Sequence, residues 1–192
     1  MGKVIFVISM SLDGFIAGPN MRLEAGLGDG GEVLHEWAFN SGNSLDRQML
    51  TEGIETLGAV ITGRRNYDMS IQWWQADGPT GPARRPLIVV SHDKPKDVPE
   101  NGVYTFVNGI DAALAQAQAT AGDKDISVMG GANIAQQFIK AGLVDEIQIH
   151  LVPVLLGDGL RMFEHLGDEQ IHLETLDVKT GEAIHMRFRV VK

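Results

Sequence analysis

ISVMGGANIAQQFIK, which runs from Ile126 to Lys140, contains the strongest local signal in the sequence. The residues before the two glycines are mostly apolar, as in a buried strand, and those after them predict a helix over Ala132–Ala141. Gly130 and Gly131 therefore mark a turn between a strand and a helix. Such a turn aims backbone N–H groups and the positive helix end at one point, where a side chain would block a pyrophosphate. The same residues also fit a tight connection in which glycine only relieves backbone strain.

Outward from this stretch, short apolar runs alternate with helical stretches. We expect the further strands to cover residues 4–8, 59–62, 87–90, 103–107 and 146–156, the last interrupted by Pro153 at an edge or a bulge. We expect the further helices to cover residues 32–39, 44–57, 64–69 and 112–121, the last capped by Asp111. The runs 171–178 and 183–191 predict a closing hairpin. This order predicts one α/β domain over residues 1–192, with a mainly parallel sheet, helices on both faces and a C-terminal antiparallel hairpin.

The composition narrows the classes of function. The formal net charge of −9 argues against nucleic acid or an anionic membrane as the main partner, because both attract a basic face. No window approaches the run of about eighteen apolar residues that a membrane span needs. The chain contains no cysteine, which excludes disulfides and thiolate metal sites, and its six histidines show no metal-ligand spacing. We therefore expect a cytoplasmic enzyme that acts on a small molecule and holds no metal ion.

Phosphate-binding side chains follow two other predicted strands. Arg64 and Arg65 come directly after the strand that ends at Gly63, and Ser91 and His92 follow the neighbouring strand. Because ligands in open α/β sheets bind at the carboxyl ends of the strands, we expect these groups to lie near the glycine turn. Guanidinium groups suit a phosphate such as the 2′-phosphate of NADPH. Three strand ends with one chemistry therefore predict a site for a nicotinamide dinucleotide.

A literal G-x-G-x-x-G pattern occurs elsewhere, at Gly26, Gly28 and Gly31. The dinucleotide fingerprint of that form needs a buried strand directly before it, and the residues before Gly26 are not one. We therefore interpret residues 20–31 as a glycine-rich loop beside the site. The chain also lacks the nucleophile elbow of serine hydrolases and the phosphate loop of nucleoside triphosphatases.

The order of the motifs resembles that of dihydrofolate reductase-like proteins. The closest likeness is to the branch that contains the reductase domain of the bifunctional riboflavin-biosynthesis deaminase-reductase. The similar segments are ISMSLDGFIAG (Ile8–Gly18), ITGRRNY (Ile61–Tyr67), VVSH (Val89–His92), VMGGAN (Val128–Asn133), GLVDE (Gly142–Glu146) and PVLLG (Pro153–Gly157). The resemblance covers nearly the whole chain and implies a dihydrofolate reductase-like fold that transfers a hydride from NADPH. It also implies a homodimer.

By position in these motifs, the resemblance implies which residues hold the cofactor. Two would lie near the nicotinamide, five would hold the adenosine phosphates and five the pyrophosphate. In that order they are Ile16 and Ala17, then Gly63, Arg64, Arg65, Ser91 and His92, then Gly130, Gly131, Ala132, Asn133 and Ile134.

The resemblance implies a small heterocyclic substrate that is pyrimidine- or pterin-like, as for 5-amino-6-(5-phosphoribosylamino)uracil reductase. Dihydrofolate reductase activity and a nucleotide-binding module without turnover are the alternatives. Folate reductases usually have a third glycine where this chain has Ala132, and the first helix offers Glu32 and Glu36 in no recognisable acidic motif.

Three residues are candidates for the substrate end of the site. Asp13 is a possible proton donor, although an Asp before Gly also forms turns through its own backbone contacts. Trp37, on the first helix, could form a wall of the pocket or belong to the core. Arg85 resembles the arginine with which folate reductases bind the glutamate tail of their substrate.

Overall fold

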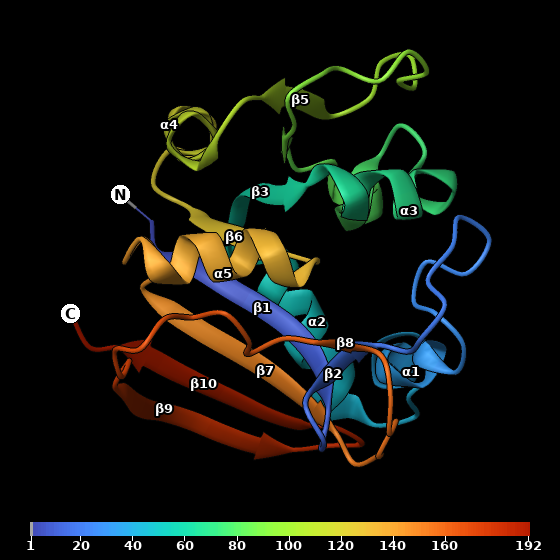
Figure 1. The fold of residues 1–192 in the computed structure, drawn as a ribbon, viewed down its shortest axis with the longest axis vertical. Coiled ribbons are helices and arrows are strands. Elements are labelled where there is room, and N and C mark those ends of the chain that lie inside the picture. The colour runs from blue at the N-terminus through green and yellow to red at the C-terminus, as the bar shows by residue number, and fades with distance from the viewer. Residues whose placement is uncertain (1) are drawn as a thin grey trace.

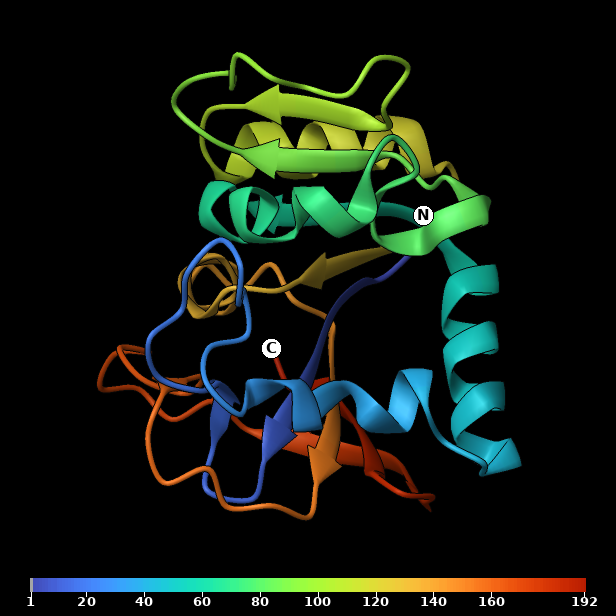
Figure 2. The ribbon, with the colours of Figure 1, turned by 90° about the vertical axis from the view of Figure 1, so that its right-hand side faces the viewer.

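The computed structural model describes residues 2–192, which form a twisted sheet with helices on both faces (Figures 1 and 2). The strands are β1 (Val4–Ser11), β2 (Phe15–Ala17), β3 (Leu57–Gly63), β4 (Leu87–Val90), β5 (Tyr104–Val107), β6 (Asp125–Met129), β7 (Glu146–Val152), β8 (Leu160–Arg161), β9 (Leu173–Thr180) and β10 (Ile184–Val190). The helices are η1 (Gly31–His35), α1 (Glu36–Phe39), α2 (Ser44–Thr56), α3 (Arg64–Trp74), η2 (Gly78–Ala83), α4 (Ile110–Ala121) and α5 (Ala132–Lys140), where η marks a 3-10 helix.

The main sheet has eight strands in the order β5-β4-β3-β6-β1-β7-β10-β9. The pairs from β5 to β7 are all parallel, whereas β10 runs antiparallel to both β7 and β9. Strands β2 and β8 form a separate antiparallel pair. The predicted fold class, a mainly parallel sheet closed by an antiparallel hairpin, is therefore confirmed.

Side chains alternate along each strand, so the sheet packs a separate set of side chains on each of its two faces. On one face Phe6 packs with Val128 and with Phe138 of α5, and α4 adds Ala113 and Ala117 to the same core. Phe6 and Phe138 are fully buried, which stabilises the fold by roughly 1.5–3 kcal/mol for each side chain. Figure 2 shows α2 on the opposite side of the sheet from α5.

The second face carries α3 over one half of the sheet and α1 with α2 over the other. Tyr67, Ile71 and Trp74 of α3 pack on Val60 and Leu87, which belong to β3 and β4. At the far end of the sheet α2 contacts the β9–β10 hairpin through side-chain hydrogen bonds. The central strands β6, β1 and β7 lie between these two helical groups, and this gap in the helical layer is where the site forms.

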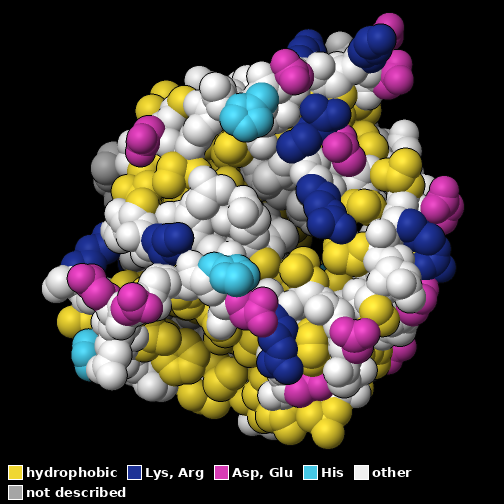
Figure 3. Space-filling view, viewed as in Figure 1, with side chains coloured by type: hydrophobic (Ala, Val, Ile, Leu, Met, Phe, Trp, Pro, Cys, Tyr) yellow, Lys and Arg dark blue, Asp and Glu magenta, His cyan; other side chains and the backbone are white. Residues whose placement is uncertain are grey.

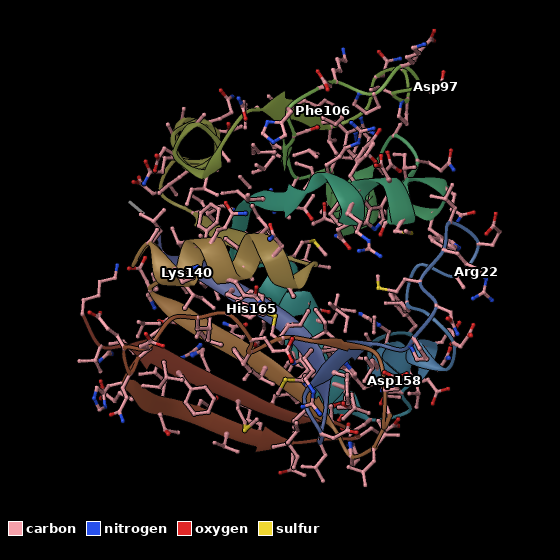
Figure 4. The ribbon with its side chains drawn as sticks, in the orientation of Figure 1. Arg22, Asp97, Phe106, Lys140, Asp158 and His165 are labelled. Atoms are coloured by element: carbon pink, nitrogen blue, oxygen red, sulfur yellow. The ribbon has the colours of Figure 1, made fainter. Side chains whose placement is uncertain are left out.

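The front face of the hairpin has no helix above it, and hydrophobic side chains gather there (Figure 3). Lys140 marks the C-terminal end of α5 in Figure 4, so the N-terminal end of that helix points towards the loop that carries Arg22. Within residues 2–192, no helix is both long enough and apolar enough to cross a membrane.

The structure corrects several predicted boundaries. Strand β7 ends at Val152 and is paired on both sides, so Pro153 marks neither an edge strand nor a bulge within the strand. Proline ends the pairing because it has no N–H to donate. Helix α4 is capped by Gly109 with a positive φ of 87°, and Asp111 lies in its first turn instead of capping it.

Two predicted segments differ in length or type from those observed. The helix predicted over residues 32–39 is a 3-10 turn followed by four α-helical residues. Helix α3 extends through residues 70–74, beyond the end expected at residue 69, because Ile71 and Trp74 pack on an apolar surface of the sheet.

Candidate functional site

A cleft of about 1650 Å³ opens on the second face of the sheet, between α3 on one side and α1 with α2 on the other. Its floor consists of alternate side chains from three adjacent strands, namely Ile5, Val7, Ser9, Ser127, Met129, Gln148 and His150. The glycine-rich loop around Gly26 forms part of its rim, as the sequence predicted. In Figure 3 the molecule is hollowed between its upper and lower parts, and Lys or Arg side chains stand at the rim.

The glycine turn lies at one end of the cleft. Gly130 and Gly131 have positive φ angles of 62° and 65°, which glycine adopts without strain. A Cβ on Gly130 would collide with the Asn66 side chain, whose amide donates to the Thr62 hydroxyl at 2.9 Å. Gly131 precedes α5 without any side-chain cap, so the first N–H groups of that helix have no side-chain acceptor. An anion at this point would find both free donors and the positive helix end.

The arginine pair borders the same end, but its two members differ. Arg64 donates from Nε to the Asp68 carboxylate at 2.7 Å and from Nη1 to the Asp93 carbonyl at 3.0 Å. Its Nη1 also lies 3.4 Å from the Ser91 hydroxyl. Arg65 is exposed, lines the cleft and forms no ion pair within the described part of the chain. Arg65 is therefore the guanidinium that is free to bind a ligand phosphate.

All twelve residues predicted to hold the cofactor line this one cleft, although they come from four separate segments. They are Ile16, Ala17, Gly63, Arg64, Arg65, Ser91, His92, Gly130, Gly131, Ala132, Asn133 and Ile134. Trp37 lines it as well and is buried, so it serves both as a wall and as part of the core. The residues present thus fit a dinucleotide, while binding itself stays a prediction.

Asp13 does not line the cleft, and its contacts argue against the predicted role as proton donor. Its carboxylate accepts hydrogen bonds from the Ser11 hydroxyl at 2.6 Å and from the backbone N–H groups of Leu156 and Gly157 at 3.1 and 2.8 Å. The Ser11 hydrogen bond is the largest cause that lowers the pKa of Asp13 to about 2, and burial offsets only part of it. Asp13 is therefore an ionised acceptor that ties the β1–β2 turn to the loop after β7.

Arg85 lies before β4, at the amino end of the strand, and does not line the cleft. Its backbone N–H donates to the Thr80 hydroxyl at 2.9 Å, and its Nη2 reaches the Ile54 carbonyl of α2 at 3.5 Å. Its Nε is buried without a hydrogen-bond partner in the described residues. In this arrangement Arg85 supports the α2 wall and does not reach a substrate in the cleft.

A row of polar side chains crosses the floor at the other end of the cleft. Ser9 of β1 pairs in register with His150 of β7, which pairs in register with His185 of β10. Trp37 of α1 donates from Nε1 to the Ser9 hydroxyl at 3.0 Å, and its ring lies 4.2 Å from that of His150, centroid to centroid. These contacts fix the orientation of the His150 ring beside the cleft.

The row continues into a buried hydrogen-bond chain. His150 and His185 face each other through their Nδ1 atoms at 2.7 Å, and His185 Nε2 lies 2.7 Å from Asp46 Oδ1. Burial alone would raise the pKa of Asp46, but the hydrogen bonds from His185, the Ser41 hydroxyl and the Glu182 N–H outweigh it and hold the pKa below its usual value. Burial, with His185 and His35 nearby, lowers the pKa of His150 to about 3.

Sequence reasoning missed this chain, because its members stand far apart along the sequence. The available signal was the pair Gln148 and His150, which are the polar positions of one face in an otherwise apolar strand. Only the antiparallel register of β10 brings His185 opposite His150. Within residues 2–192, no group of three or more His, Asp or Glu side chains is arranged to hold a metal ion.

Comparison with known proteins places the chain in a family. The RibD C-terminal domain matches residues 2–185, and the chain therefore belongs to the RibD C-terminal domain family. Among curated proteins it is similar to YyaP of Bacillus subtilis (strain 168), with 28% identity over 186 residues that cover 93% of this chain and 88% of YyaP.

Two solved structures share the fold. A protein from Shewanella sp. PV-4 that bears a riboflavin biosynthesis description has a TM-score of 0.72 and 23% identity, and the match covers 99% of both chains. Acinetobacter baumannii RibD, in its form 1, has a TM-score of 0.69 and 19% identity. That match covers all of this chain but 59% of the RibD chain. These likenesses confirm the predicted dihydrofolate reductase-like, RibD-type fold.

Asp13→Asn tests the structural role of that carboxylate. A carboxylate whose pKa falls from its usual 3.8 to about 2 on folding stabilises the protein above that usual value, and the stabilisation is lost as the pH falls towards 2. We therefore expect the wild type to exceed Asp13→Asn in stability at about pH 6 and the difference to shrink at about pH 3. Urea denaturation at both pH values measures it. A difference that stays constant would contradict the assigned contacts.

Proposed function

We propose that this member of the RibD C-terminal domain family is an NADPH-dependent reductase that transfers a hydride to a small pyrimidine- or pterin-like heterocycle. The observation that carries the proposal is the convergence of all twelve predicted cofactor residues on one cleft at the carboxyl ends of β3, β4 and β6. Family membership supports the reductase class. The likeness to RibD favours 5-amino-6-(5-phosphoribosylamino)uracil or a close analogue as the substrate.

The phosphate end of the cleft supports the cofactor assignment. The N-terminus of α5 and Gly131 would hold the pyrophosphate, because their N–H groups have no side-chain partner. Arg65 would pair with the 2′-phosphate that distinguishes NADPH from NADH. Arg64, already held by Asp68, would position this loop and contribute its charge.

The other end of the cleft would hold the nicotinamide and the substrate. When bound there, the cofactor supplies the hydride. Ile16, Ala17 and Trp37 form apolar walls that orient the rings and exclude water. Ser9 and His150 are the polar groups of the floor at this end, so they would meet the atom of the substrate that must gain a proton.

Dihydrofolate is the second candidate substrate. The observation in its favour is that Glu32 and Glu36, the two carboxylates of the first helical segment, both line the cleft, where folate reductases carry an acidic residue. The position of Arg85 weighs against it, because that side chain does not reach the cleft to bind a glutamate tail.

Turnover tests the function directly. NADPH absorbance should fall when the protein receives the phosphoribosylaminouracil, and more slowly or not at all with dihydrofolate. Oxidation only with dihydrofolate, together with inhibition by methotrexate and loss of activity in Glu36→Gln, would favour the second candidate. Tight NADPH binding without oxidation in a panel of pyrimidines and pterins would indicate a nucleotide-binding module instead.

Arg65→Ala tests whether Arg65 binds the 2′-phosphate of NADPH. A charge-assisted contact is worth about 1–3 kcal/mol, so we expect the dissociation constant for NADPH to rise about 5- to 150-fold while that for NADH changes little. Calorimetric titration of both cofactors measures this. Arg189→Ala is the matched control, because Arg189 is exposed on the hairpin and paired with Glu174. Equal losses for NADPH and NADH would show that Arg65 does not bind the 2′-phosphate.

A further inference from the structure

We propose that His150 is the proton donor of this reductase and that His185 and Asp46 form a buried relay that supplies its proton. The inference rests on the proposed function and names the group that completes the reduction. It is carried by a continuous hydrogen-bond chain that begins at a sealed carboxylate on α2 and ends at a ring nitrogen in the cleft.

The inner part of the chain is closed to solvent. The side chains of Asp46 and His185 are 0% and 2% exposed. Asp46 accepts from His185 through Oδ1, and through Oδ2 from the Ser41 hydroxyl at 2.7 Å and the Glu182 N–H at 3.0 Å. A carboxylate with three donors around it stays ionised and offsets a positive charge on the neighbouring imidazole.

The outer end of the chain opens into the cleft. His150 uses Nδ1 to contact His185, and the Trp37 ring packs against its ring at a tilt of 36°. Its other nitrogen, Nε2, has no hydrogen-bond partner within residues 2–192 and is not a buried atom, while the residue itself lines the cleft. Nε2 is thus the one point at which a ligand can contact the chain through the histidine pair.

Two nitrogens that face each other at 2.7 Å must share one proton, and this leaves two arrangements. In the first, His185 is protonated on both nitrogens and donates to Asp46 and to His150, so His150 carries its own proton on Nε2. In the second, His185 has only its Nε2 proton, and His150 donates from Nδ1. In the first arrangement His150 Nε2 is a proton donor that faces the cleft. In the second arrangement the same atom has only a lone pair.

The first arrangement suits a reductase. Hydride addition to a C=N or C=O carbon sends the π electron pair to the nitrogen or oxygen, which takes the proton from His150 Nε2. His150 Nδ1 takes the shared proton from His185 in the same step, and the chain passes to the second arrangement. Solvent returns one proton to the chain after product leaves. His150 stays neutral throughout, which agrees with a pKa that burial lowers to about 3.

Other titratable groups surround the chain, and none of them within residues 2–192 forms a hydrogen bond with His150 Nε2. His35 packs nearby, and burial lowers its pKa, so it stays neutral. The Glu182 carboxylate lies outside the chain, 2.9 Å from the Ser41 hydroxyl that donates to Asp46, and the Lys179 amino group, in register with His185, lies 3.4 Å from the Asp177 carboxylate. Glu32 and Glu36 line the cleft from the first helical segment. Asp13 is held as an acceptor away from the cleft.

The state of the protons can be observed without substrate or cofactor. In protein labelled with ¹⁵N in its imidazoles, long-range ¹H–¹⁵N spectra distinguish a protonated from a bare ring nitrogen. At the pH of maximal turnover we expect His150 to carry its proton on Nε2 with Nδ1 bare, while both ring nitrogens of His185 carry protons. At that pH, a His150 ring protonated on Nδ1 with a bare Nε2, or one protonated on both nitrogens, would overturn the relay.

Kinetics test the same chain through variants. His150→Gln should lower kcat about 100- to 10,000-fold, the usual contribution of a general acid, with NADPH affinity unchanged. His172→Gln is the matched control, because this histidine is exposed and outside the cleft. Asp46→Asn should move the alkaline limb of the kcat profile to lower pH by about 1–3 units, because the charge that holds the extra proton is gone.

The outcomes separate the relay from the proposed function. Turnover in the wild type that persists in His150→Gln would overturn the relay and leave the reductase standing. A wild type that oxidises no NADPH would refute the function, and the role of His150 as donor would fall with it. Asp46→Asn reports on the positioning role only through its pH profile, since a merely structural residue would lower activity at every pH. If Asp46→Asn does not fold, the kinetics of His150→Gln and the nitrogen spectra of the wild type still test the relay.

Discussion

Asp46 carries a buried carboxylate that joins helix α2 to the β9–β10 hairpin, and the shape of the cleft depends on this connection. Its oxygens accept from the side chain of His185 in β10 and from the backbone of Glu182 in the turn between the two strands. Removing one partner of such a buried pair typically costs about 3–5 kcal/mol, because the remaining charge stays in the interior. A second and longer contact between α2 and the hairpin runs from Lys179 Nζ to Met49 Sδ at 3.8 Å. Because Asp46 holds α2 against the hairpin, α2 forms one side of the cleft and does not cover the floor that β1, β6 and β7 form.

The cleft has two chemically different ends, and each follows from the sheet topology. Parallel pairing of β3, β4 and β6 brings the arginine pair, Ser91 and the glycine turn to one edge. The register between β1, β7 and β10 brings Ser9, His150 and His185 into one row at the other end. A dinucleotide with its phosphates at the first end would extend towards the second, which is the arrangement a reductase requires.

Local sequence signals were enough to predict the end of the cleft that contains the glycine turn and the arginine pair. They could not predict the end that contains His150, because its residues meet only through long-range strand pairing. The two glycines stand next to each other between a strand and a helix, and Arg64 and Arg65 directly follow a strand, so a short window contains each signal. Asp46, His150 and His185 meet only through an antiparallel register that no short window contains. Asp13 is the opposite case, in which a clear local signal did not indicate chemistry. The Asp13-Gly14 pair is easily seen after the first strand, but the Asp13 carboxylate accepts a backbone hydrogen bond from Gly157. Its contacts are those of a residue that forms a turn, which is the other role that the sequence allowed for it.

A crystal structure of the protein with NADP⁺ would show which residues contact each part of the dinucleotide. We expect the pyrophosphate at Gly131 and the N-terminus of α5, the 2′-phosphate at Arg65, and the nicotinamide beside Ser9, Trp37 and His150. A dinucleotide bound outside the cleft, or one whose nicotinamide lies away from His150, would contradict the account.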